Sequence, residues 1–551
     1  MTIHPAPGFT MASYGQGDVG VSGQSHAAAT RRLCVQTYST LVQHPSLVIA
    51  VALNALAYIV FRYWNSPWRK LPPGPTGYPF IGSLRKFLDL HWLFDECPKY
   101  GDVVYLNVAG QPTIILNTQK AASDLLDRRA ISYSSRPSFV VRNKLMCGGM
   151  FLPFETHNDR WRRQRRIINE GFNKSAAARF HAAEAEEAIR LGAALIHDPT
   201  NFCKHYRDYV SSAVLSVTYD RPLHGGPHDQ TLRTGIQTFI QGIVDSSLIG
   251  QFVDLFPWLA YMPEWMAKWK RDARLAFEES SSFFLEMVDD VEARMKQGTA
   301  RPCLVVTLLE ELERFGVSRL EAAWSAGIMY AAGSETTSGI LEWWSLAMIA
   351  HPDVQKRAQM ELDAVVGRER PPTLADRAHL PYTVAILREV MRWRSGLPVG
   401  VPHAADADDF YEGMFIPKGT ILVSNILSCN RDATIYGDDA GAFRPQRHLD
   451  EQGRLAPAPP TTKEHGHVSF GFGRRICVGQ HVAEDTLFIA VAVLLWAFQF
   501  SKARSEDGRE IEVDFEGFTA AGFLIRANEY KCAITPRFPK ATAILTGEKE
   551  F

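Results

Sequence analysis

A glycine-rich loop that ends in a cysteine stands directly before a long apolar run near the C-terminus. The loop is Phe470–Gly479 (FGFGRRICVG), and the apolar run covers residues 483–500. Its glycines permit tight backbone turns and let a flat ligand approach the main chain. The run predicts a helix, so Cys477 stands at a helix N-terminus, where the dipole, the free amide groups and nearby Arg475 favour a thiolate. Such a thiolate is suited to be an axial ligand of iron.

The other cysteines and the charge balance exclude several classes of protein. The eight cysteines are widely scattered and include no Cys-x-x-Cys pair, which argues against a zinc ribbon or a dense disulfide scaffold. Lys and Arg number 59 against 60 Asp and Glu, so the chain has no general attraction for phosphate backbones. We therefore expect no nucleic-acid partner, and seven of the cysteines are interpreted as reduced, mostly buried thiols.

The front of the chain predicts a membrane anchor ahead of the main body. Residues 1–40 are predicted to be a flexible tail, because its first thirty residues are rich in small and polar types and lack an apolar period. Residues 41–64 are strongly apolar and, with aromatic residues at their end, are long enough to span a bilayer. The proline-rich segment 65–75 is a stiff linker. Residues 76–551 form the catalytic body.

Two alternatives to the anchor are a buried core helix and a cleaved secretory signal. The long preceding tail and the lack of a small-residue cleavage site argue against the cleaved signal. The N-terminal position of the run, and the basic residues Arg62, Arg69 and Lys70 just after its most apolar part, residues 47–61, favour an anchor over a core helix. We expect a single-pass anchor with the body in the cytosol.

The body shows mainly helical patterns with a few short strands. Alternating apolar residues predict strands at 103–108, 113–116 and 415–419 and near the C-terminus, whereas helical periodicity dominates residues 120–395. The fold class is therefore mainly α, of α+β type, with a small β-rich region.

A second motif interrupts a long apolar helix. Residues 332–337 (AGSETT) lie inside a helix that opens with the capping box Ser318-x-x-Glu321. A glycine, an acid and two threonines at its centre each weaken a helix, which is expected at a functional site. Thr336 can donate to the carbonyl of Ala332 and open a notch in the helix.

Three weaker motifs accompany these two. Glu389 and Arg392 share a helix face, and the later loop 443–448 (FRPQRH) offers Arg447 as a third member. Trp161 and Arg165 are also on one helix face, within a basic stretch that could equally be a solvated surface. His403 follows the segment Gly400-Val401-Pro402.

In this order, the motifs resemble those of the cytochrome P-450 family, over about residues 71 to 535, and are most similar to fungal microsomal members. The resemblance implies the cytochrome P-450 fold, with haem b held between the helix of Glu335 and the loop of Cys477. It makes Cys477 the axial thiolate and metal ligand, and Glu335 and Thr336 the catalytic residues that deliver protons. It assigns the haem propionates to Trp161, Arg165, His403 and Arg475. The Glu389 trio is structural.

The resemblance also implies the function. We expect a monooxygenase that inserts one oxygen atom from O2 into a lipophilic small molecule by hydroxylation or epoxidation, in a secondary-metabolite pathway such as that of a terpenoid or polyketide. Electrons come from NADPH through a cytochrome P-450 reductase, with cytochrome b5 as a further candidate partner. The expected location is the endoplasmic reticulum membrane. Alternatives are a haem-thiolate isomerase or dehydratase, a xenobiotic or fatty-acid hydroxylase, and a haem sensor or electron carrier.

Several apolar segments are candidates for the substrate pocket. They are the loop 132–150 and the segments 324–333, 397–401 and 518–523, whose small and apolar residues favour a bulky apolar substrate. Residues 252–269 are rich in aromatic residues and are either core or a membrane-contacting lid.

Overall fold

The computed structural model describes residues 45–223, 232, 234–243, 252–253, 256–521 and 524–547. The chain divides into two compact units, residues 1–70 and 71–551. The predicted tail, residues 1–40, lies outside the described residues.

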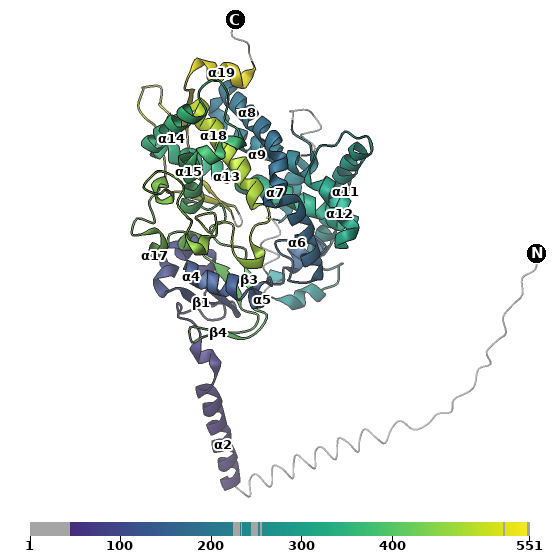
Figure 1. Cartoon of the computed structure of the whole chain (residues 1–551). Coiled ribbons are helices and arrows are strands. Elements are labelled where there is room, and N and C mark those ends of the chain that lie inside the picture. Colours follow the sequence, from purple (N-terminus) through teal and green to yellow (C-terminus); the bar gives the residue numbers. More distant parts are fainter. Residues whose placement is uncertain are drawn as a thin grey trace, which may run out of the picture. The chain divides into compact units, whose positions relative to one another are not determined.

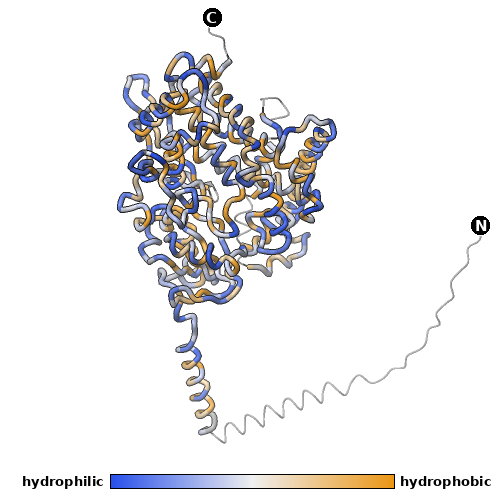
Figure 2. Tube along the Cα trace, in the orientation of Figure 1, coloured by the Kyte–Doolittle hydropathy of each residue, from blue (hydrophilic) through white to orange (hydrophobic). Residues whose placement is uncertain are grey.

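The first unit contains the helix α2 (Pro45–Trp64) and the short 3-10 helix η1 (Pro67–Lys70). Apolar side chains of α2 are exposed, and Val51, Tyr58 and Phe61 are each more than 60% exposed. Figure 2 shows the hydrophobic character of this helix. Among the described residues, one helix has the length and hydropathy to cross a membrane, α18 (Gln480–Ala497), but it is mostly buried in the body and is therefore a core helix.

Helices make up most of the second unit (Figure 1). The longer ones are α6 (Asp159–Phe172), α8 (His181–His197), α9 (Phe202–Tyr219), α11 (Lys268–Lys296), α12 (Leu304–Phe315), α13 (Arg319–Ala350), α14 (Pro352–Val365), α15 (Pro381–Trp393) and α18. Short helices include α3 (Leu84–Leu88), α4 (Gln119–Ala122), α5 (Ala130–Tyr133), α7 (Lys174–Ala177), α16 (Ile426–Cys429), α17 (Ala433–Tyr436) and α19 (Pro539–Thr546).

Within the described residues, the strands form one four-stranded sheet and three antiparallel pairs. The larger sheet has the order β1 (Val103–Val108), β2 (Gln111–Leu116), β6 (Ile421–Ser424) and β3 (His403–Ala404), and only β2 and β6 are parallel. The pairs are β4 (Asp409–Tyr411) with β5 (Met414–Ile416), β7 (Phe498–Lys502) with β10 (Cys532–Pro536), and β8 (Phe518–Ala521) with β9 (Leu524–Ala527). The predicted mainly helical fold with a small β-rich region is confirmed.

The helix α13 forms the centre of the core. The predicted capping box at Ser318 and Glu321 is present, and α14 begins with Pro352 directly after α13 ends. Trp343 and Trp344 of α13 are fully buried, and α18 contributes a continuous buried stretch that includes Trp496. Burying aromatic side chains of this size is among the largest apolar contributions to stability.

The loop Phe470–Gly479 is held in one conformation by its glycines. Gly473 has a φ of +59°, and a Cβ added there would lie 2.0 Å from the carbonyl oxygen of Leu126, so only glycine fits. The backbone N–H of Cys477 donates to the carbonyl of Phe470 at 2.9 Å and closes the loop. The following helix begins at Gln480, three residues earlier than predicted.

Candidate functional site

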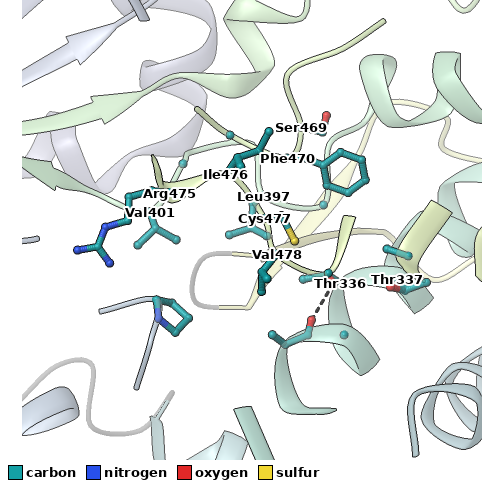
Figure 3. Close-up of a pocket in the computed structure, with 18 of the residues that line it drawn as sticks. Thr336, Thr337, Leu397, Val401, Ser469, Phe470, Arg475, Ile476, Cys477 and Val478 are labelled. Carbon is teal, nitrogen blue, oxygen red and sulfur yellow. Dashed lines mark hydrogen bonds between the residues drawn. The ribbon is translucent and has the colours of Figure 1, made fainter. Parts of the chain in front are cut away.

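A cavity of about 290 Å³ lies between α13, the loop of Cys477 and the start of α18. Figure 3 shows the loop residues on one side of it and Thr336 and Thr337 of α13 on another. Small or apolar residues form most of the wall, including Val214, Met329, Ala332, Gly333, Ile340, Leu397, Gly400, Val401, Phe470, Ile476, Val478 and Leu487. A flat apolar ligand with one end near the basic residues described below fits this lining.

The Cys477 side chain is exposed to the cavity, yet it lies deep in the body. This burial raises the pKa of its thiol, and the effect outweighs the backbone hydrogen bond at Gly479 and the positive charge of Arg165, which both lower the pKa. The helix terminus favours the thiolate, as predicted, through the backbone hydrogen bond at Gly479, but burial outweighs it, and the positive charge comes from Arg165 and not from the predicted Arg475. A metal ion would reverse this balance, because coordination deprotonates a thiol.

Arg475 does not place its charge beside the sulfur. Its side chain donates to the carbonyl oxygens of Ser134 and Glu155, both at 2.7 Å, and its guanidinium lies 4.1 Å from the ring centroid of Trp161. In Figure 3 the guanidinium points away from Cys477. The nearest influential cation on the thiol is Arg165 of α6 instead.

The helix α13 is notched where it borders the cavity. The Thr336 hydroxyl donates to the carbonyl of Ala332 at 2.8 Å, as the sequence predicts (Figure 3). Gly333 lets α9 pack closely against this part of α13, because a Cβ added there would lie 3.2 Å from Val214 of α9. The hydroxyl oxygen of Thr336 can therefore still accept a hydrogen bond at the cavity wall.

Glu335 is turned away from the cavity that Thr336 lines. Its carboxylate accepts a hydrogen bond from Arg526 of β9 at 2.6 Å. Arg526 also donates to Glu342 at 2.7 Å and to Ser338 at 3.0 Å. Glu335 thus pairs with an arginine nearly two hundred residues later in the chain. Nothing in the sequence pattern indicates this pairing. The structure brings Thr336 to the cavity and leaves Glu335 in this ion-pair network.

The four residues predicted for propionates all line the cavity, together with Arg136, which the sequence reasoning missed. Arg136 comes from the loop after α5, and it donates to the carbonyls of Pro153, Val401 and Pro402. Burial lowers the pKa of Arg136, Arg165 and Arg475. Arg165 has no hydrogen-bond or ion-pair partner among the described residues. One buried guanidinium, that of Arg136, and two partly buried ones at the same cavity favour an anionic ligand.

His403 on β3 is buried and neutral. Its Nδ1 lies 2.7 Å from the carbonyl oxygen of Tyr133, so Nδ1 carries the proton and Nε2 is an acceptor. Burial and Arg136 lower the pKa of this imidazole well below its usual range. Binding a carboxylate through Nε2 therefore requires a proton that the surroundings disfavour.

The predicted contact of Glu389, Arg392 and Arg447 is confirmed. Glu389 is fully buried and accepts two hydrogen bonds from Arg392, at 2.7 and 2.8 Å, and one from Arg447 at 3.0 Å. His448 lies 2.9 Å from Glu389 Oε2 and adds a fourth member that the sequence motif does not include. Arg392 also donates to three carbonyls of the loop 430–442 and ties that loop to α15.

Some of the expected pocket residues lie elsewhere. Trp324 packs against Phe284 and donates to Ser281, because its side chain faces α11 and not the cavity. Phe518 contacts His91 and Phe94. Residues 522–523 lie outside the described residues. Leu397, Gly400 and Val401 of the predicted segment 397–401 do line the cavity, and Gly396 and Arg136 line it with them.

Several aromatic residues of the segment 252–269 are exposed, although Val253 and Ala267 of the same segment are buried. Trp258, Tyr261 and Trp265 are 65%, 89% and 78% exposed, and Phe252 is about half exposed. A short 3-10 helix, Pro257–Tyr261, presents part of this exposed aromatic patch. The core alternative is therefore wrong for these exposed aromatic residues.

The donor set fits the haem that the sequence predicts. One sulfur faces an apolar cavity, and three guanidiniums without an internal anionic partner surround one side of it. The iron of a haem needs the sulfur as a ligand, and its flat ring needs the apolar cavity. The two propionates of the haem need the guanidiniums.

Comparison with known proteins agrees with this geometry. The sequence profile of the cytochrome P-450 family matches residues 72–531. A cytochrome P-450 monooxygenase of Armillaria gallica is 46% identical over 91% of this chain and 96% of its own length, and one of Amanita muscaria is 38% identical over 92% and 97%. A zebrafish cytochrome P-450 solved with progesterone superposes with a TM-score of 0.67 at 24% identity, covering 82% of this chain and all of its own.

Proposed function

Because the chain belongs to the cytochrome P-450 family and is a haem monooxygenase, we propose that it inserts one atom of O2 into a lipophilic small molecule, by hydroxylation or epoxidation. The observation that carries this proposal is the single apolar cavity that Cys477 and the Thr336 notch share. The haem of the family supplies the oxidising chemistry when bound. We assign the axial ligand to Cys477 and the binding of the carboxylates to Arg165, Arg475 and Arg136, beside Trp161 and His403.

Proton delivery is the proposed task of Thr336 and Glu335. The Thr336 hydroxyl donates a hydrogen bond to the carbonyl of Ala332, so its oxygen can accept one from a water in the cavity and hold that water in place. Glu335 can relay a proton only after its carboxylate leaves Arg526 and takes up a proton from solvent. The ion pair of Glu335 with Arg526 must therefore open before Glu335 can take part in proton delivery.

Replacing Thr336 by alanine should divert electrons from product to hydrogen peroxide. A positioned proton donor or acceptor is worth ~10²–10⁴ in rate, so product formed per NADPH should fall at least about tenfold while peroxide rises. Thr336→Ser keeps the hydroxyl and should retain most of the coupling. Peroxide and product are measured against NADPH consumed with a turned-over substrate. Unchanged coupling in Thr336→Ala would remove this role.

Replacing Arg165 by methionine should weaken haem binding without unfolding the body. Arg165 has no internal partner among the described residues, so its loss leaves no orphaned carboxylate. A hydrogen bond to a charged group contributes about 1.5–3 kcal/mol, so haem affinity should fall roughly 10- to 100-fold. Arg166→Met, an exposed change on the same helix, is the matched control. The readout is haem transfer to apomyoglobin. Equal haem loss in both variants would contradict the assignment.

The apolar lining supports a lipophilic substrate, and we propose a secondary metabolite such as a terpenoid or polyketide intermediate. Electrons are proposed to come from NADPH through a cytochrome P-450 reductase, with cytochrome b5 as a further partner. A xenobiotic or fatty-acid hydroxylase would show the same need for O2 and NADPH, whereas an isomerase or dehydratase would need neither.

The test of this function is metabolite profiling of a host that expresses the full chain with a reductase under ¹⁸O2. The proposal expects a new product that carries ¹⁸O and is absent when Cys477 is replaced. A new product without the label would favour the isomerase or dehydratase alternative. No new product from a panel of terpenoid- and polyketide-producing hosts would contradict the proposed substrate class.

We further propose that α2 anchors the chain in the endoplasmic reticulum membrane, with the body in the cytosol. Its 20 residues span about 30 Å at 1.5 Å per residue, which matches the hydrocarbon core of a bilayer. The exposed aromatic patch around Trp258 and Tyr261 would add a second contact with lipid. Deleting residues 1–64 should release the chain from alkaline-washed membranes. A glycan on Asn173, which lies in an Asn-Lys-Ser sequon, would contradict the cytosolic orientation.

A further inference from the structure

A cluster of metal-ligating side chains lies outside the haem cavity, between α8 and α18. It consists of His181 and Glu184 in the first turn of α8 and Asp485 of α18. One ligand atom from each of the three residues lies within 4.8 Å of the other two. His181 Nε2 is 3.2 Å from Asp485 Oδ2. The spacing of His181 and Glu184, three residues apart on a helix, places both on the face that meets α18.

Glu184 is the group in this cluster that the protein leaves unsatisfied. The residue is 1% exposed, and its Oε2 atom is buried without a hydrogen-bond partner. Its other oxygen accepts a hydrogen bond from the Thr486 hydroxyl at 2.7 Å. Burial and the nearby Asp485 raise the pKa of this carboxyl well above its usual range. A buried carboxylate oxygen without a partner is costly, and a cation beside it would remove that cost.

Neighbouring side chains hold the two carboxylates of the cluster in place, as such side chains do around many metal centres. Thr486 fixes the Glu184 carboxylate through Oε1, and Arg377 fixes the Asp485 carboxylate through Oδ1. One oxygen of each carboxylate is therefore held from outside, which leaves Glu184 Oε2 and Asp485 Oδ2 as the candidate ligand atoms. Such outer partners orient metal ligands and often decide their affinity. His181 is 39% exposed and provides a route for an ion to enter.

We propose that His181, Glu184 and Asp485 form a binding site for a divalent transition-metal cation, of which Zn²⁺ is the best match. One imidazole and two carboxylates are a common three-ligand set for zinc, with water in the fourth position. Zinc would link α8 to α18 next to Thr486, which itself lines the haem cavity. The site is distinct from the haem site and stabilises the helix that follows the Cys477 loop.

The test uses the full-length, haem-loaded chain with its purification tag removed, stripped with EDTA and titrated with Zn²⁺. Bound zinc per haem is measured by elemental analysis after desalting, and the thermal midpoint is followed in parallel. We expect one zinc per chain, and at a hundred times its Kd a stabilisation of about 2.7 kcal/mol. Glu184→Gln and His181→Asn should each weaken zinc binding at least tenfold.

Matched controls lie on the same helix. Glu186→Gln and His197→Asn change exposed residues of the same types and should leave zinc binding unchanged. The proposal is overturned if the wild type binds no more zinc than Glu184→Gln. It is also overturned if Glu184→Gln raises the thermal midpoint above that of the zinc-saturated wild type, because Glu184 would then be a protonated carboxyl that simply destabilises the core. Haem content is recorded throughout and should be equal in all variants.

Discussion

Replacing Cys477 by histidine should abolish product formation while the body stays folded. The side chain lies in the cavity wall, and the hydrogen bond that closes the loop comes from the backbone N–H of residue 477, which the substitution keeps. Changes in the outer shell of a metal site typically cost 10- to 100-fold in activity, so loss of the axial ligand should exceed about 100-fold. A nitrogen ligand also lacks the electron donation of a thiolate that favours O–O cleavage.

The measurement is labelled product in the co-expressing host, together with the ratio of haem to protein. Cys203→Ser is the control, because Cys203 is partly buried on α9 and does not line the cavity. This control should retain both product and haem. If Cys477→His makes product at a rate near that of the wild type, Cys477 is not the ligand.

Replacing Glu389 by glutamine should remove a large share of the stability of the body. Glu389 and Arg392 are both fully buried, and the carboxylate also binds Arg447 and His448. Removing one member of a buried ion pair leaves the other charge uncompensated, which costs about 3–5 kcal/mol. The variant should unfold at much lower denaturant concentration and yield little haem-loaded protein. Glu313→Gln, an exposed change on α12, should stay within about 0.5 kcal/mol of the wild type.

The same variant predicts a pH dependence with a definite sign. Burial alone would raise the pKa of Glu389, but the hydrogen bonds from Arg392 and His448 outweigh it and lower the pKa to about 2. Because the folded pKa lies below the unfolded value of roughly 4.3, the stabilisation is complete above about pH 4.5 and is lost as the pH falls towards 2. The stability gap between wild type and Glu389→Gln should therefore be constant near neutrality and narrow below pH 4. A gap that widens in acid would contradict this assignment.

The sequence predicted those parts of the site that depend on local chemistry. The capping box of α13, the hydrogen bond from Thr336 to Ala332 and the ion pair of Glu389 with Arg392 each involve residues three or four positions apart. Helix geometry brings such pairs together whatever the rest of the chain does. Arg447 was also found, because the resemblance to a known family supplied the long-range contact.

The directions of long side chains could not be predicted, because they depend on segments far apart in the sequence. Arg475 stands two residues before Cys477 in the loop, yet its guanidinium points away because it donates to the carbonyls of Ser134 and Glu155. Glu335 is held by Arg526, which a hairpin near the C-terminus supplies. Arg136 lies in the loop 132–150, which the sequence marks as a pocket segment, but no motif singles out its guanidinium. The thiol pKa depends on depth in the fold, which the sequence does not reveal.

The most direct test of the account is the absorption spectrum of the reduced, haem-loaded wild-type protein under carbon monoxide. If Cys477 binds the iron as a thiolate, the Soret band should be strongly red-shifted, and Cys477→His should return it to the position typical of histidine-ligated haem. A wild-type band already at that histidine position would show that the sulfur of Cys477 does not bind the iron.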